Sequence, residues 1–192
     1  MRAYKGFNEN LKCTCGKGIF TYEPGRTYTE EQSKTASTGF HCAEYLPDCF
    51  KFYQVNGKNR FYQVEAGGSI DEEQFDTKIA CTELTLVREL TLKQMAIACM
   101  LYMVAHPLRH WEVSCGGCMI AKEQAAGRTG IVIARGSRPK VKGEKGCAIG
   151  LVLEKKGNIL QAQAAEIDGK HIKPDTWYSI SKEGKIYAIQ ED

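Results

Sequence analysis

The chain carries little net charge and no long apolar segment. Its 26 lysines and arginines nearly balance 23 aspartates and glutamates, which leaves a formal charge of +3. This small excess does not make nucleic acid an obligatory partner. The longest strongly apolar run covers only residues 95–105, whereas a bilayer-spanning helix needs about 20 apolar residues. The polar N-terminus lacks the apolar stretch of a secretory signal, so we expect a cytoplasmic protein without a membrane partner.

Cysteine, in contrast, is abundant, with nine residues in a chain of 192. Their odd number and the absence of an export signal argue against the disulfide framework of a secreted domain. We therefore expect reduced thiols. Hydrophobic residues make up 43% of the chain and charged residues 26%, which is typical of one compact globular domain or two small ones.

Short extended segments alternate with turn signals in the first half of the chain. Apolar residues spaced by three and four positions predict a short helix over 46–53. Thr91 is a good N-cap for a helix over 92–105, which is apolar on nearly all sides and is therefore expected to be buried. We predict an N-terminal domain, residues 1–106, with a mixed sheet, short helices and this one long buried helix.

The second half is rich in glycine and in β-branched residues. Turn signals such as Asp168-Gly169 separate its apolar runs and favour hairpins. We therefore expect a β-rich domain over 107–192, built as an antiparallel β meander or a small β-roll, and an α+β fold class for the whole chain. The predicted strands cover residues 130–136, 146–158, 159–169, 176–180 and 185–189.

Two signatures resemble an uncharacterised family of phage- and prophage-encoded bacterial proteins. The N-terminal signature, YKGF followed by GFHxxE, lies at residues 4–7 and 39–44, and the C-terminal signature, DGxxIKPDTWY, lies at 168–178. The resemblance implies an accessory protein in the cytoplasm of the bacterial host cell, which needs no cofactor and acts by binding a host macromolecule such as a protein. Interference with host defence is the use that this context suggests.

A second resemblance connects residues 1–90 to ADP-ribosyltransferase folds. The initial YKG is similar to the strand that holds nicotinamide in those folds, and GFHCA, ahead of a predicted helix ending in tyrosine, is similar to the strand that stacks on it. The alternative that it implies is an NAD-dependent ADP-ribosyl transferase or an NAD-binding protein. Tyr4 and Gly6 would then hold the nicotinamide amide, His41 and Tyr53 would frame its ring, and Glu83 would stabilise the oxocarbenium-like sugar.

The same side chains also have a structural interpretation, which stays open. A histidine on a short strand often bonds a nearby backbone carbonyl, and tyrosines on a helix face or an edge strand commonly belong to the core. Lys5 would either neutralise a diphosphate or stay solvated as a surface cation. Convergence of Tyr4, His41, Tyr53 and Glu83 in one cleft would favour the enzyme.

Cys115 and Cys118 have the CxxC spacing that suits a zinc ion or a redox pair. A zinc site needs a second pair of ligands, which only Cys13 with Cys15, or His106 with His110, would supply. Pro107 disrupts the helix that would align the two histidines. We therefore expect no metal, and favour a glycine-rich turn that joins two strands.

Residues 128–145 carry six basic side chains and one acidic one, a local charge of +5. If the basic side chains share one face, they would bind phosphates, and nucleic-acid binding is the third hypothesis for this chain. No aromatic residue for base stacking lies within this stretch, so a solvated basic loop is the favoured interpretation. The candidate nucleic-acid-binding residues are Arg128, Arg135, Arg138, Lys140 and Lys142.

Overall fold

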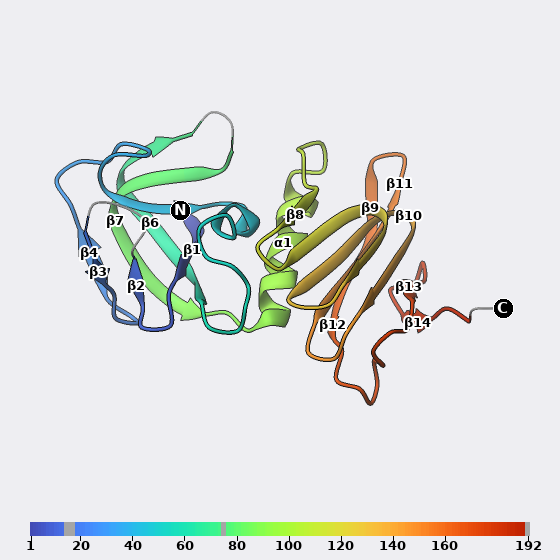
Figure 1. The fold of residues 1–192 in the computed structure, drawn as a ribbon. Coiled ribbons are helices and arrows are strands. Elements are labelled where there is room, and N and C mark those ends of the chain that lie inside the picture. The colour runs from blue at the N-terminus through green and yellow to red at the C-terminus, as the bar shows by residue number, and fades with distance from the viewer. Residues whose placement is uncertain (14–17, 74–75, 191–192) are drawn as a thin grey trace. The chain divides into compact units, whose positions relative to one another are not determined.

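The computed structural model describes residues 1–13, 18–73 and 76–190 (Figure 1). By its internal contacts the chain divides into two compact units, Met1–Leu90 and Thr91–Asp192. Both units are mostly β, and the described residues contain one α-helix and one short 3-10 helix, broadly consistent with the predicted α+β class. No helix within the described ranges combines the length and the apolar character needed to cross a membrane.

The first unit is a small antiparallel barrel. Strand β7 pairs with β5 and with β6, and β1 pairs with the same two strands, so that the four strands close a ring. Strand β4 adds to β7, and β2 pairs with β3 as a separate hairpin. The elements are β1 (Arg2–Phe7), β2 (Lys12–Cys13), β3 (Phe20–Thr21), β4 (Thr27–Thr29), β5 (Phe40–Ala43), η1 (Leu46–Cys49), β6 (Arg60–Glu72) and β7 (Lys78–Glu89).

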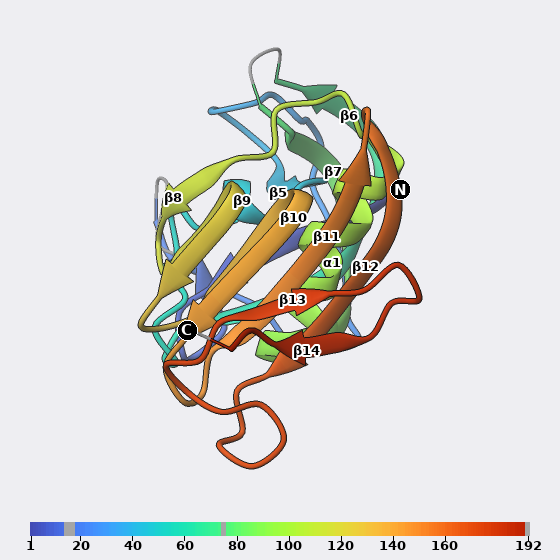
Figure 2. The ribbon, with the colours of Figure 1, turned by 90° about the vertical axis from the view of Figure 1, so that its right-hand side faces the viewer.

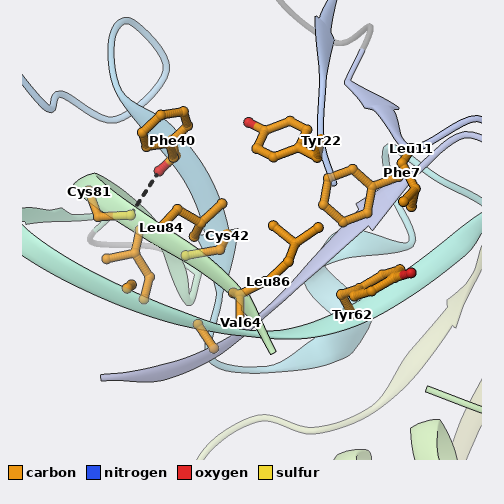
Figure 3. Close-up of a cluster of buried hydrophobic side chains, with 13 residues drawn as sticks. Phe7, Leu11, Tyr22, Phe40, Cys42, Tyr62, Val64, Cys81, Leu84 and Leu86 are labelled. Atoms are coloured by element: carbon orange, nitrogen blue, oxygen red, sulfur yellow. Dashed lines mark hydrogen bonds between the residues drawn. The ribbon is translucent and has the colours of Figure 1, made fainter. Parts of the chain in front are cut away.

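Alternate residues of the barrel strands point inward and form an apolar core (Figure 3). Phe7 of β1 packs edge-on against Tyr22 and Tyr62, with ring centroids 5.0 and 5.7 Å apart, a geometry that aromatic rings prefer. Register shifts in the pairing of β6 with β7 mark bulges, which bend strands and help a sheet to close.

Two predictions for this unit are wrong in detail. The sheet is not mixed, because every strand pairing that the structure describes within residues 1–90 is antiparallel. Helix 46–53 is shorter than predicted: η1 covers only Leu46–Cys49, with Pro47 in its first turn, and turns lead on to Tyr53. Leu46, Pro47 and Cys49 of this short helix are buried.

The second unit begins with helix α1 (Leu92–Ala105), whose bounds are those predicted. Thr91 and Gln94 form a capping box, in which each side chain accepts a hydrogen bond from the other residue's backbone N–H. The strands that follow are β8 (Val113–Cys115), β9 (Cys118–Gly127), β10 (Ile131–Gly143), β11 (Ala148–Lys155), β12 (Asn158–Glu166), β13 (Tyr178–Ile180) and β14 (Ile186–Ala188).

The predicted antiparallel meander is wrong for the centre of this unit, since β10 runs parallel to both β9 and β11. Strand β9 bends at Glu123, whose φ is +61°, and the register with β10 shifts there from Arg135 to Lys140. The Glu123 carboxylate fixes the bend by accepting hydrogen bonds from the backbone N–H groups of Ser137 and Arg138, at 2.8 and 2.9 Å. Because the chain bends here, β10 can begin beside the start of β9 and run parallel to it.

The bend at Glu123 and the matching register shift in β10 divide these strands into two layers. An apolar core lies between the layers. Figure 2 shows β9, β10, β11 and β12 side by side, with α1 behind them and β13 and β14 in front. Both faces of β11 and of the first half of β10 are therefore covered, and Ile131, Val132, Ile133 and Ala134 are all fully buried. Strands buried on both faces read as continuous apolar runs, and this explains the sequence GIVIARG.

Helix α1 packs against β10, β11 and β12 of its own unit. Gly150 makes room for it, since a Cβ atom there would lie 3.0 Å from Met100 Sδ. The sequence prediction instead grouped this helix with residues 1–106. The helix is also less buried than predicted, because Leu101 and Val104 remain 49% and 47% exposed.

Candidate functional site

Tyr4, Gly6 and Tyr53, the proposed nicotinamide-binding residues, lie together in the first unit, but as packed core. A Cβ atom at Gly6 would lie 2.9 Å from Cδ2 of Tyr53, so the glycine allows the tyrosine to pack directly on β1. Tyr4 and Tyr53 are only 5% and 7% exposed. The chain itself therefore covers the aromatic rings that would have to stack on a nicotinamide.

His41 and Glu83, the proposed catalytic residues, occupy neighbouring strands. His41 is half-buried on β5, opposite Ala80 of β7. Burial and the nearby Lys5 ammonium lower the pKa of His41, and no hydrogen-bond partner for its Nε2 is found among the described atoms. Glu83 is exposed on β7, beside Gly67 of β6. The carboxylate of Glu83 is exposed whereas Tyr4 and Tyr53 are buried, so these side chains do not line one common cleft.

Lys5, which the sequence suggested as a diphosphate ligand or a solvated surface cation, is instead buried inside the barrel. It is 5% exposed because its side chain lies on the same, inward side of β1 as those of Ala3 and Phe7. Its ammonium donates a hydrogen bond to the backbone oxygen of His41 and lies 5.5 Å from the centroid of the Tyr22 ring. The alternation of side chains along RAYKGF was the signal that could have placed it inside.

Two thiols, those of Cys42 and Cys81, lie in the barrel interior (Figure 3), and the charge of Lys5 acts on Cys81. A hydrogen bond from the Cys42 thiol lowers the pKa of Cys81, and the Lys5 ammonium adds to this effect. Cys81 also bonds the backbone oxygen of Phe40 at 3.4 Å. The thiols of Cys42 and Cys81 are 4% and 0% exposed, so they are closed to a large substrate.

Cys115 and Cys118 close the tight turn between β8 and β9, directly opposite each other, as the turn interpretation predicted. Cys118 is buried against the thiol of Cys99 on α1. No group of three or more His, Cys, Asp or Glu side chains suited to a metal ion is found in residues 1–13, 18–73 and 76–190. Cys15, one of the ligands considered for zinc, lies outside the described residues.

The basic residues of 128–145 do not share one face. Arg135 is 2% exposed and forms an ion pair with Glu154, while its guanidinium lies 5.0 Å from the ring centroid of Trp111. This residue cannot reach a phosphate, because it lies on the helix-facing side of β10. Arg128 is exposed and lies 3.8 Å from the carboxylate of Glu144. Arg135 is therefore not one of the nucleic-acid-binding residues, contrary to the sequence prediction.

Lys140 and Lys142 lie instead on the outer side of the second layer, where the pairing of β10 with β13 brings aromatic residues to them. Since Val141 pairs with Tyr178, Lys142 stands opposite Trp177, and its Nζ lies 5.2 Å from that ring's centroid. Lys140 stands opposite Ser179, which pairs in turn with Tyr187 of β14. Tyr187 is 47% exposed. We call Lys140, Lys142, Trp177 and Tyr187 the cationic–aromatic face.

Sequence reasoning could not assemble this face, because about 40 residues separate its lysines from its aromatic side chains, a span over which sequence patterns do not fix strand pairing. Arg138, the remaining basic candidate, is exposed at the bend beside it. The face combines two groups that bind nucleic acid: cations for phosphates and aromatic rings for bases.

The chain belongs to a family described as a domain of unknown function (DUF7666), whose model matches residues 1–98. The match covers the whole barrel unit and the first half of α1. It agrees with the predicted resemblance to an uncharacterised family. No curated protein and no solved structure matches the chain.

Proposed function

We propose that the chain acts by binding, and that it holds a single-stranded nucleic acid on the cationic–aromatic face. The observation that carries this proposal is the pairing of β10 with β13 and of β13 with β14, which sets Lys142 beside Trp177 and places Tyr187 two strands from Lys140. The basic stretch alone lacked any aromatic side chain. With the two rings, one surface offers both kinds of contact.

The lysines supply the electrostatic part of binding. Lys140 is exposed and Lys142 is half-exposed, so both ammonium groups can meet phosphates without unfolding. Each phosphate that a lysine neutralises releases counterions, and for a single strand it adds about 0.7 to the slope of log K against log salt. Binding should therefore weaken steeply as salt rises.

The aromatic side chains favour a single strand over a duplex. A flat ring stacks on a base only when that base is not already stacked inside a helix, and stacking contributes about 1–3 kcal/mol per base. Tyr187 is the more accessible of the two rings, while Trp177 is half-buried against Lys142. Lys142 lies over the Trp177 ring, so a cation for a phosphate and a ring for a base occur at the same place on the face.

This function fits the accessory role that the terminal signatures imply. In a phage-encoded protein, a single-stranded host or phage nucleic acid is the macromolecule expected on the face, and its occupation would be the means of interfering with host defence. The geometry gives less support to ADP-ribosyl transfer, because Tyr4 and Tyr53 are covered by the chain. A host protein as the partner rests on the resemblance alone.

The test is the binding of a fluorescein-labelled oligothymidylate, measured by anisotropy at about 50 and about 200 mM salt. Lys140→Gln combined with Lys142→Gln should lower the salt slope by about 1.4, because two phosphate contacts are lost. Tyr187→Ala should weaken binding about tenfold at either salt concentration, through the loss of one stacking contact.

A matched control is Lys155→Gln with Lys156→Gln, which removes the same charge from the exposed turn between β11 and β12. It should leave the slope within about 0.3 of the wild-type value, since it removes no phosphate contact. Absence of binding by the wild-type chain would overturn the proposal. Equal losses in the face variant and the control variant would show only a general charge effect and would overturn it as well.

A further inference from the structure

The turn that joins β8 to β9 holds two cysteines in a geometry close to that of a disulfide. Cys115 and Cys118 are direct partners in the antiparallel pairing, and the Cα atoms of such partners lie about 4.5–5.5 Å apart. Disulfides span about 4.4–6.8 Å between Cα atoms. The side chains of direct partners also point to the same side of the strands.

Gly116 and Gly117 allow the two cysteines to come close enough for a disulfide. Their φ angles are +59° and +80°, both in the left-handed region that a two-residue hairpin turn requires. To form the bond, the two Cβ atoms must come about 1 Å closer than in an ordinary strand pair. Two glycines give the turn the freedom for this change, because neither carries a side chain that resists rotation of the backbone.

The two thiols differ in their surroundings. Cys115 is half-exposed, whereas Cys118 is 4% exposed and contacts the thiol of Cys99. The hydrogen bond with the Cys99 thiol and burial raise the pKa of Cys118, so Cys118 is not the thiol that attacks first. An accessible thiol beside a buried one is the arrangement of an attacking cysteine and its resolving partner.

We propose that Cys115 and Cys118 are a redox-active dithiol that reduces small-molecule disulfides. The Cys115 thiol loses its proton to solvent, and its sulfur attacks one sulfur of a disulfide R–S–S–R. A mixed disulfide forms and R–S⁻ leaves, taking up a proton. The Cys118 sulfur, on losing its proton, attacks the sulfur of Cys115 and displaces the second R–S⁻. Two electrons and two protons pass from the protein to give two R–SH and one Cys115–Cys118 bond.

The experiment exposes the full chain to glutathione buffers of increasing oxidised fraction, followed by alkylation and peptide mass spectrometry. In the wild-type chain, a disulfide should map to the peptide that contains Cys115 and Cys118. Cys118→Ser should stop the reaction after its first step and leave glutathione bound to Cys115. Cys115→Ser should abolish both products, and Cys147→Ser, which removes another buried thiol of the same unit, should change nothing.

The wild-type map does not depend on how well any variant folds. Absence of a Cys115–Cys118 bond at every glutathione ratio would overturn the proposal, as would disulfides that form only between other cysteines. Glutathione spread evenly over several cysteines in Cys118→Ser would also overturn it, because an attacking role requires that Cys115 react in preference to the others. Oligonucleotide binding is a separate readout, so this site and the cationic–aromatic face can fail independently.

Discussion

Replacing Glu154 with glutamine tests whether Arg135 is a structural residue of the second unit. The Arg135 side chain is 2% exposed, and its Nε donates a hydrogen bond to Oε2 of Glu154 at 2.5 Å. Its Nη2 donates to the backbone oxygen of Pro107 at 2.8 Å, and no partner for Nη1 is found among the described atoms. The variant would leave a buried guanidinium without its carboxylate.

The expected loss follows from the burial of the pair. Breaking a buried ion pair by removing one partner costs about 3–5 kcal/mol. The Glu154 side chain is 26% exposed, so water can partly replace it, and we expect a loss of about 3 kcal/mol in the free energy of unfolding. Arg135→Met added to Glu154→Gln should recover most of this loss, because two neutral side chains leave no buried charge unpaired.

Urea unfolding followed by tryptophan fluorescence measures this loss. Both tryptophans, Trp111 and Trp177, lie in the second unit, and Trp111 contacts Arg135. Glu144→Gln is the matched control, because it breaks an exposed pair with Arg128 and should cost less than about 1 kcal/mol. A loss in Glu154→Gln no greater than that in the control would refute the reasoning.

Three further changes test the fold. Gly6→Ala should destabilise the barrel by about 1–3 kcal/mol, because its methyl group would collide with Tyr53; unchanged hydrogen exchange of the β1 amides would contradict this. The folded pKa of His41 is lowered, so its contribution to stability is complete above about pH 6.5 and is lost as the pH falls through the folded pKa. The urea midpoint should therefore decline less between about pH 7.5 and 5.5 in His41→Gln than in the wild type, and parallel declines would count against it. Thr91→Ala should cost about 1 kcal/mol through the lost capping box with Gln94, and an unchanged midpoint for the second unit would rule the cap out as a source of stability.

Local signals in the sequence predicted the elements that depend on residues close together in the chain. Thr91 and the apolar pattern after it predicted helix α1 to the residue, because a cap and a helical turn involve only neighbours. The turn at Gly116-Gly117 was predictable for the same reason, since its conformation requires two residues that accept positive φ. The resemblance to an uncharacterised family agrees with the family match over residues 1–98.

Tertiary structure alone decided which strands pair and which side chains those pairings bury. Local propensity does not distinguish a parallel from an antiparallel partner, so the bend at Glu123 and the parallel β9, β10 and β11 were not predictable. The same holds for Arg135, basic in sequence yet buried against Glu154, and for Trp177, which meets Lys142 only across a strand pairing. Burial and pairing are set by contacts among residues far apart in the chain, and those contacts created the cationic–aromatic face.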